Sequence, residues 1–391
     1  MLLDLPEQEK TERGLEHTPR EIWQQPVTWR KTYQRCRELR SDLTEMLRSA
    51  GIGPRSTAPP AVYLVGAGTS DYTGRALAPL LRRRWQCDAW PLPSTTLLTD
   101  FEDFHRAGSE YLWISFSRSG DSPEGVALLE RALDLHRGIR HVVITCNPKG
   151  KMAQLCARHP GRALALILDD AVNDRGLAMT SSFTNMLLAG QCVAHVDEFE
   201  DFGDVVEQIA NTGERFLPAA AEVAASITTL GCTRACFVGS GALRAVAEEC
   251  ALKVVELSAG KVTSLAETPL GLRHGPMSSV DGQTVFVAFL SSDSRRRGYE
   301  LDLLREIDRK RLGRVRAVVT VQGIDDVSPL VDYCLPLDCP ADFPDHYRPV
   351  LDVMLGQLVG LFASMRSGLK PDQPSPGGTI TRVVQPIKLY S

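Results

Sequence analysis

The segment ISFSRSGDSPEG places a group of small and hydroxyl-bearing residues directly after an apolar run. Ser117, Ser119 and Ser122 supply hydroxyl donors, and Gly120 allows a ligand to approach the backbone closely. Pro123 suits the first turn of a helix, and the free N–H groups of a helix amino terminus attract anions. Two interpretations follow: a cradle for a phosphate monoester, or a strand-to-helix turn in which Ser122 caps the helix.

Two other polar segments follow apolar runs. GAGTSDYTG lacks the GxGxxG glycine spacing of a dinucleotide fingerprint, so we do not expect a nicotinamide cofactor. Its Ser70 and Thr69 are candidates for hydrogen bonds to sugar hydroxyls. In AMTSSFTN, Thr180 and Ser181 are further candidate donors, or they cap a helix.

The segment EECALKVVELSAGK carries charge on a predicted helix. Glu249, Lys253 and Glu256 are spaced so that they share one helix face. We expect Glu249 to lie on a solvated face with a weak ion pair. Lys253 and Glu256 lie in an apolar run, so we expect them to be partly buried, and a partly buried glutamate suits proton transfer.

In the segment LRHGP, His274 is the candidate for proton transfer. The following glycine and proline predict an exposed, rigidly held loop rather than a core position. An imidazole held in such a loop is a candidate acid–base group.

These candidates follow short apolar runs that alternate with helical patterns. Strands are predicted at 61–68, 111–117, 141–147 and 162–169, which indicates a parallel sheet with crossover helices. The same order then repeats. Gly66 and Gly239 are 173 positions apart, as are Phe116 and Phe289. The repeated strands are predicted at 234–241, 284–293, 315–323 and 333–338.

The chain is therefore predicted to contain two copies of one α/β domain, at 45–210 and 211–391. A helical extension is expected at 1–44, with residues 8–20 as a loop within it, and a helical bridge is expected at about 196–227. The copies differ in the serine segment, because Ser-Arg-Ser-Gly-Asp-Ser is replaced by Leu-Ser-Ser-Asp-Ser-Arg. This predicts an anion site that is kept in the first copy and degraded in the second.

Composition narrows the functional class. The 391 residues carry a net charge of −4, which argues against a nucleic-acid or anionic-membrane surface. No apolar run approaches the roughly 18 residues of a membrane helix, and the start of the chain does not resemble a secretory signal. The ten cysteines lack zinc-site spacing, so buried, reduced thiols and a cytoplasmic location are predicted.

In this order, GAGTS, the serine segment, ALKxxELxxGK and LRHGP resemble the double-SIS sugar isomerases, over roughly residues 20–391. RGLAMTSSFTN and the tail KPDQPSPGGTITRVVQPIKLY are typical of the tagatose-6-phosphate ketose/aldose isomerase and galactosamine-6-phosphate deaminase group. The resemblance implies two tandem SIS domains, each a flavodoxin-like, three-layer α-β-α fold with a parallel five-stranded sheet. It also implies a homodimer or a larger homo-oligomer.

The resemblance also implies roles for the candidate residues. Glu256 matches the base that moves a proton between C1 and C2, and His274 matches the ring-opening histidine, which in relatives can come from a neighbouring subunit. The remaining residues are expected to bind the phosphate or the sugar: Ser70, Ser117, Arg118, Ser119, Ser122, Thr180, Ser181, Lys253 and Gln385. Arg118 stands where relatives often carry glutamine, and Gln385 stands where a distant relative has an imine-forming lysine, so an imine through that position is not expected.

The resemblance implies conversion of galactosamine 6-phosphate to tagatose 6-phosphate and ammonia, without a metal or another cofactor. Two alternatives remain: aldose–ketose isomerisation of a hexose 6-phosphate without ammonia release, and a non-catalytic sugar-phosphate sensor. Each enzyme alternative requires the serine segment and the Glu256–His274 pair to act on one substrate. No nucleic-acid or membrane partner is expected.

Overall fold

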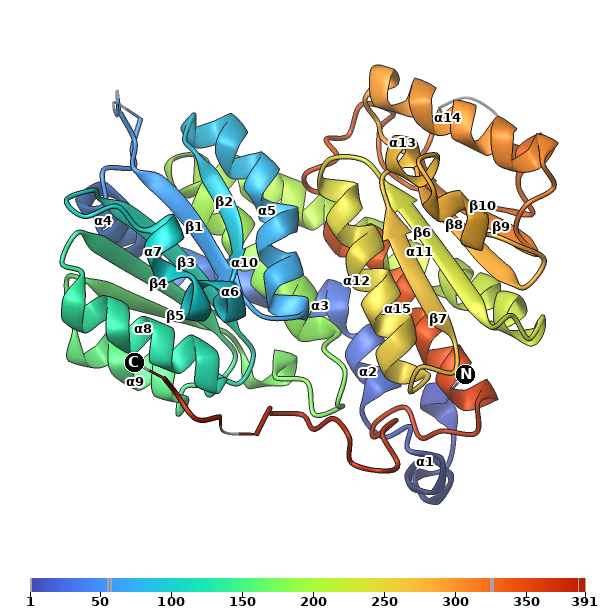
Figure 1. Cartoon of the computed structure of the whole chain (residues 1–391), viewed down its shortest axis with the longest axis horizontal. Helices are drawn as coiled ribbons and strands as arrows, with labels where there is room; N and C mark the ends of the chain where they lie inside the picture. The colour runs from blue at the N-terminus through green and yellow to red at the C-terminus, as the bar shows by residue number, and fades with distance from the viewer. Residues whose placement is uncertain (1, 55, 57, 324–326, 386, 391) are drawn as a thin grey trace. The chain divides into compact units, whose positions relative to one another are not determined.

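The computed structural model describes residues 2–390 except 55, 57, 324–326 and 386. The chain divides into two compact units, each built around one parallel sheet (Figure 1). One unit comprises residues 27–174, 181–207 and 380–391, and the other comprises residues 1–26, 175–180 and 208–379. None of the described helices has the length and apolar character that crossing a bilayer requires.

The first repeat contains a five-stranded sheet in the order β2-β1-β3-β4-β5, with every neighbouring pair parallel. Its strands are β1 (Ala61–Gly66), β2 (Ala89–Pro93), β3 (Tyr111–Ser117), β4 (Ile139–Thr145) and β5 (Ala163–Ile167). Strands β3 and β4 are almost wholly buried, which explains why apolar residues make up most of their sequences.

Helices cover both faces of this sheet. α5 (Thr69–Trp85) and α10 (Ser181–Ala194) pack together on one face, and Figure 1 shows α8 (Pro123–Leu135) and α9 (Lys151–Arg158) on the other. The short helices α6 (Ser94–Thr99) and α7 (Phe101–Phe104) pack beside α8 around Phe101 and Trp113. Sheet order and layers are those of a flavodoxin-like domain.

The second repeat contains the corresponding parallel sheet, β10-β9-β8-β6-β7. Its strands are β6 (Arg234–Gly239), β7 (Thr263–Glu267), β8 (Thr284–Phe289), β9 (Val315–Val321) and β10 (Tyr333–Leu337). α12 (Ala242–Leu257) and α15 (Pro349–Arg366) pack on one face. On the other, α13 (Pro269–Leu272) and α14 (Ser294–Arg309) enclose an apolar core that includes Phe286 and Leu304.

The remaining α-helices lie before the first sheet or between the two sheets in sequence, and short 3-10 turns are spread along the chain. They are α1 (Glu7–Arg13), α2 (Thr18–Trp23), α3 (Gln25–Glu38), α4 (Arg40–Ser49) and α11 (Phe199–Thr229), with 3-10 turns at η1 (Leu2–Asp4), η2 (Asp170–Val172), η3 (Val196–Glu198), η4 (Pro276–Ser279) and η5 (Ser328–Leu330). The helix predicted at about 196–227 is confirmed as α11.

The expected loop at residues 8–20 is wrong, because α1 and α2 occupy most of it. Ion pairs one turn apart, Lys10–Glu7 at 2.7 Å and Arg13–Glu9 at 2.6 Å, support the polar helix α1. Gly14 ends it in a left-handed conformation with φ 62°. The domain boundaries at 45–210 and 211–391 stay a prediction.

Candidate active site

The serine loop, residues 117–122, connects β3 to α8 at the carboxyl edge of the first sheet. It is ordered by its own hydroxyls: Ser117 Oγ accepts from the N–H of Gly120 at 3.0 Å, and Ser119 Oγ accepts from the N–H of Asp121 at 3.2 Å. Ser122 precedes α8 but makes no side-chain cap bond; its hydroxyl donates to Glu124 at 3.0 Å. The capping interpretation of Ser122 is therefore not supported by the described contacts, whereas the loop remains at an edge where ligands bind.

The loop is held against the turn after β4 by close backbone packing. Gly120 has φ 65°, and a Cβ on Gly150 would lie only 2.7 Å from the carbonyl oxygen of Ser119. Asn147 donates its amide to that same carbonyl oxygen at 2.8 Å. The N–H of Lys151 donates to the carboxylate of Asp121 at 2.9 Å. Sequence reasoning did not select Asn147 or Gly150, although both follow a buried strand at the same edge.

Ser70 lies in the first turn of α5, after β1, and is buried. A Cβ on Gly66 would lie 2.4 Å from the Ser70 carbonyl, so glycine at the end of β1 permits this turn. One turn along α5, Asp71 pairs with Arg75 at 2.8 Å. The GAGTS segment therefore forms a second strand-to-helix turn at the carboxyl edge of the first sheet.

Ser181 opens α10 and is fully buried. Its hydroxyl donates to Asp174 at 2.6 Å, and the hydroxyl of Ser182 donates to the other oxygen of Asp174 at 2.5 Å. Both backbone N–H groups also donate to Asp174, so Asp174 caps the helix. In the other unit, the Thr180 carbonyl accepts from the Gln357 amide at 3.2 Å.

Arg118 is buried in the serine loop, and its guanidinium donates to the carbonyl oxygen of Arg382 at 2.6 Å. Arg382 in turn donates to the carbonyl of Asp174 at 2.7 Å and to the side chain of Asn173 at 2.6 Å. These bonds attach the carboxy-terminal tail to the first repeat. Gln385, three residues further along, is exposed.

In the second repeat, α12 carries a compact charge cluster. Lys253 and Glu249 are fully buried, with 3.4 Å between their charged groups, and Lys253 also pairs closely with Glu256. The Glu256 side chain is 24% exposed, so a substrate can reach it. Burial by itself lowers the pKa of Lys253, but the carboxylates of Glu249 and Glu256 raise it above its ordinary value overall.

The expectation that Glu249 lies on a solvated face is therefore wrong. The reason is the close packing of α15 against α12. A Cβ on Gly356 would lie 2.2 Å from the sulfur of Cys250, and a Cβ on Gly360 would lie 2.9 Å from the Lys253 carbonyl. Because these two glycines bring the helices together, the side chains of Glu249 and Lys253 are sealed from solvent.

His274 lies between α13 and η4 and is exposed, as its glycine- and proline-containing segment predicted. The backbone N–H of His274 donates to the carbonyl of Gly271 at 3.0 Å. The side chain of neighbouring Arg273 pairs with Glu306 of α14 at 2.8 Å. Gly275 follows with φ 121°. The backbone around His274 is therefore fixed while its imidazole faces solvent.

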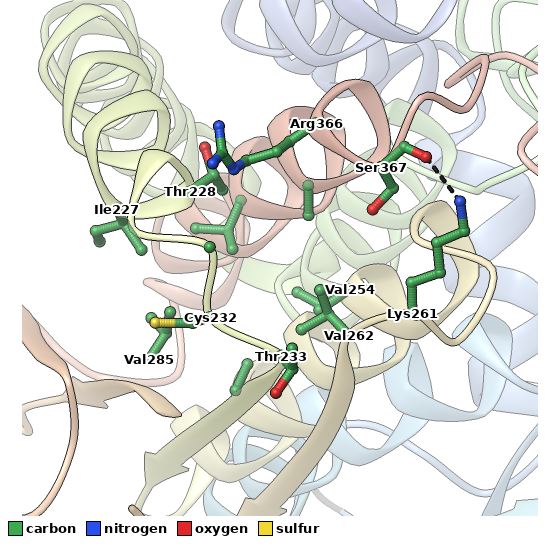
Figure 2. Close-up of a pocket in the computed structure, with 14 residues that line it drawn as sticks. Ile227, Thr228, Cys232, Thr233, Val254, Lys261, Val262, Val285, Arg366 and Ser367 are labelled. Carbon is green, nitrogen blue, oxygen red and sulfur yellow. Dashed lines mark hydrogen bonds between the residues drawn. The ribbon is translucent and has the colours of Figure 1, made fainter. Parts of the chain in front are cut away.

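A cavity in the second repeat lies at the opposite edge of its sheet (Figure 2). Thr233 and Val285 line it where β6 and β8 begin, with Val254 and Arg366 from α12 and α15. It contains none of the predicted site residues. The candidate site residues lie in the carboxyl-edge loops of the first repeat and in the α12 cluster and the His274 segment of the second, and this cavity is not among these places.

The comparisons with known proteins agree with this fold. D-galactosamine-6-phosphate deaminase AgaS of Escherichia coli is 34% identical over 95% of both chains, and that of Shewanella sp. (strain ANA-3) is 32% identical over 97% of this chain and 93% of its own. This chain belongs to the same family of SIS-type sugar isomerases. No protein-family model matches the chain.

A solved structure of the family gives the same result for the fold. Tagatose-6-phosphate ketose/aldose isomerase from Escherichia coli superposes with a TM-score of 0.84 at 32% identity, over 93% of this chain and 95% of that one. The predicted fold class, two tandem SIS domains with parallel five-stranded sheets, is thereby confirmed, and so is the predicted family.

Proposed function

We propose that this family member converts galactosamine 6-phosphate and water into tagatose 6-phosphate and ammonia. The observation that carries the proposal is the α12 cluster: Glu256 is accessible and is paired with the buried ammonium of Lys253. A carboxylate held in this way is an acceptor for a carbon-bound proton. The proposal is also supported by the relatives, which carry the name of this deaminase.

We propose that the serine loop binds the phosphate. Ser117, Ser119 and Ser122 supply hydroxyls, and the first turn of α8 adds N–H groups with a partial positive charge. The buried side chain of Arg118 adds positive charge beside the loop. Ser70, Thr180, Ser181, Lys253 and Gln385 are proposed as further substrate contacts.

The proposed chemistry begins with ring opening. His274 accepts the proton of the O1 hydroxyl and donates a proton to the ring oxygen as the bond between C1 and the ring oxygen breaks. Glu256 then takes the proton from C2 of the open-chain amino aldehyde while the carbonyl oxygen at C1 gains one. The product of this step is an enolamine with a double bond between C1 and C2.

Glu256 next returns its proton to C1, which leaves a C=N bond at C2. Water adds to C2, the C–N bond breaks, and ammonia leaves with formation of the ketone. One water is consumed and one ammonia is released, and no electrons are exchanged with another molecule. Each positioned proton transfer contributes on the order of 10²–10⁴-fold to the rate.

A second candidate is the isomerisation of galactose 6-phosphate to tagatose 6-phosphate. It uses the same two proton transfers, with oxygen instead of nitrogen at C2. The name of the solved structure, tagatose-6-phosphate ketose/aldose isomerase, favours it. For either reaction we propose a homodimer or a larger homo-oligomer in the cytoplasm, which light scattering and cell fractionation would test.

The test is to incubate the protein with galactosamine 6-phosphate and to measure ammonia and ketose separately. Equal amounts of both support the deaminase. Ketose from galactose 6-phosphate, with no ammonia from the amino sugar, selects the isomerase instead. Binding of hexose phosphates without any product would contradict both and select a sensor.

A further inference from the structure

The loop after β8 in the second repeat, Leu290–Asp293, holds a carboxylate from a distant part of the chain. Ser291 donates its hydroxyl to one oxygen of Asp345. The other oxygen accepts from the N–H of Ser292 at 2.8 Å and from the hydroxyl of Ser292 at 3.0 Å. Asp345 is almost completely buried. The loop therefore surrounds this carboxylate with hydroxyl and backbone donors.

Two arginines also contact Asp345, and the nearby carboxylate of Glu300 accepts from the N–H of Ser291 at 2.7 Å. Arg296, in the first turn of α14, lies 3.3 Å from one carboxylate oxygen, and Arg348 lies 3.3 Å from the other. Arg348 is fully buried and is fixed by Asp352 at 2.8 Å and by the carbonyl of Leu290 at 2.7 Å. Hydroxyls, a backbone N–H and guanidinium groups are the donors that a phosphate or another tetrahedral oxyanion takes.

This loop is the counterpart of the serine loop, because Phe289 is the last residue of β8, its counterpart Phe116 is the last but one of β3, and α14 follows as α8 does. Residue Ser292 corresponds to Ser119 at the constant spacing of the repeat. In both loops a serine hydroxyl accepts from a loop N–H: Ser117 from Gly120 at 3.0 Å, and Ser291 from Asp293 at 3.1 Å.

The two repeats differ in the partners of the aspartate that precedes the last helix of each sandwich. Asp345 precedes α15 in the connection from β10, and Asp174 precedes α10 in the connection from β5. Asp174 caps its own helix through Ser181 and Ser182. Among the described residues, the hydroxyls of Ser117 and Ser119 donate to no carboxylate. In the second repeat the loop therefore holds a carboxylate from a distant part of the chain, whereas the carboxylate that accepts from a serine-loop hydroxyl in the first repeat is that of nearby Glu124, which bonds Ser122.

We propose that the second repeat is an oxyanion site whose ligand is the chain's own Asp345 carboxylate. Resting on the proposed function, this inference assigns the sugar phosphate to the serine loop alone, one per chain. The sequence predicted a degraded anion site in the second repeat. By this inference the site has kept its hydrogen-bond donors, and the Asp345 carboxylate occupies the place of an external anion. Its ligand class in the absence of Asp345 is a small tetrahedral oxyanion, for which inorganic phosphate is the probe.

The inference is tested by counting bound phosphate in equilibrium dialysis. Asp345→Gly removes the carboxylate and its methylene group, so the variant should bind one more phosphate per chain than the wild type. Asp345→Asn keeps the space filled and should bind no additional phosphate. Adding Arg296→Ala to Asp345→Gly should weaken the new site at least tenfold, since one of its cations is lost.

A stability measurement keeps the test decisive if Asp345→Gly folds poorly. Phosphate should raise the melting temperature of Asp345→Gly more than that of the wild type, compared with chloride at equal ionic strength. Equal phosphate numbers and equal phosphate-induced shifts in both proteins would overturn the inference, as would two sugar phosphates per wild-type chain. The proposed function is tested separately by ammonia release from the wild type. The inference about Asp345 depends only on the difference in phosphate binding between Asp345→Gly and the wild type.

Discussion

The ammonium nitrogen of Lys253 lies 3.4 Å from a carboxylate oxygen of Glu249, and neither side chain is exposed to solvent. The second carboxylate on the same ammonium, that of Glu256, is partly exposed. Glu249 therefore neutralises the lysine from inside the protein, while Glu256 faces the side from which a substrate can arrive. Two carboxylates around one buried cation also explain why the pKa of Lys253 is raised despite its burial.

Glu249→Gln should strongly destabilise the protein. The substitution leaves the Lys253 ammonium buried with one carboxylate fewer, and breaking a buried ion pair from one side costs about 3–5 kcal/mol. We expect the midpoint of denaturant unfolding to fall accordingly. The double variant Glu249→Gln with Lys253→Met removes both buried charges and should recover part of the loss.

Glu207→Gln is the matched control, because Glu207 pairs with Arg30 at 2.8 Å while its side chain is 55% exposed. Exposed pairs contribute roughly 0–1 kcal/mol. If Glu249→Gln unfolds at the same denaturant concentration as Glu207→Gln, the buried pair does not stabilise the fold as argued.

Glu256→Gln should bind substrate but lose turnover. The amide cannot accept the C2 proton, so kcat should fall by roughly 10²–10⁴, while inhibition by inorganic phosphate should stay unchanged. A direct readout is the reaction in D2O, in which the wild type should incorporate deuterium at C1 of the ketose.

Glu248→Gln is the control for this prediction, since Glu248 lies on the same helix but pairs with Arg244 at 3.2 Å. It should retain near-wild-type turnover. A fully active Glu256→Gln enzyme that still incorporates deuterium at C1 would remove Glu256 as the base.

Local sequence pattern predicts the central strands of both sheets, but it does not predict two of the edge strands. The buried strands β1, β3 and β4 consist mainly of apolar residues, so they were predictable. The edge strands β2 and β7 were not singled out. β2 contains two prolines and β7 is only partly buried, so neither carries the apolar run that marks a central strand.

The site shows the same limit at the level of side chains. The serine loop and the Lys253–Glu256 pair were predictable because residue types and helical spacing point to them. Glu249 was misjudged, because its burial depends on α15, which lies about 100 residues further along the chain. Contacts between distant segments, such as Asp345 with Ser291, leave no local pattern in the sequence.

Glu300 predicts a defined pH dependence of stability. Burial raises the pKa of Glu300 to about 7, against the hydroxyl of Ser240 and the N–H of Ser291, which lower it. The folded protein therefore favours the protonated carboxyl. The stability of the folded protein is therefore highest, with respect to Glu300, below pH 4.5. As the pH rises towards 7, the free energy of unfolding falls by about 3 kcal/mol in total, because the buried carboxyl is harder to ionise than the exposed one of the unfolded chain.

Glu300→Gln carries no ionisable group at this position, so it should gain stability relative to the wild type as the pH rises from 4.5 to 7. Denaturant unfolding of both proteins across this range measures the difference. Glu306→Gln is the contrasting control: Lys310 and Arg273 lower the pKa of Glu306, so its contribution to stability changes mainly below pH 4.5, and the difference between Glu306→Gln and the wild type should stay nearly constant from pH 4.5 to 7. A difference between Glu300→Gln and the wild type that does not change with pH would contradict the assignment.

Gly150→Ala should weaken phosphate binding without removing any group that contacts the substrate. Its new Cβ would lie 2.7 Å from the carbonyl of Ser119 and 3.0 Å from the Cα of Gly120, so the serine loop must shift. Forced backbone shifts cost about 1–3 kcal/mol, and 1.4 kcal/mol corresponds to about tenfold in affinity. We therefore expect KM for the sugar phosphate, and the inhibition constant of inorganic phosphate, to rise on the order of tenfold.

Gly125→Ala tests whether this effect belongs to the loop rather than to any lost glycine nearby. Gly125 lies in the first turn of α8, and its Cβ would meet only the sulfur of Met152 at 3.7 Å and the Cβ of Ser122 at 4.0 Å, which are ordinary contacts. Alanine also favours the helix by up to about 1 kcal/mol. Gly125→Ala should keep the wild-type KM, and equal KM values for the two variants would show that the packing of Gly150 against the serine loop does not position the phosphate.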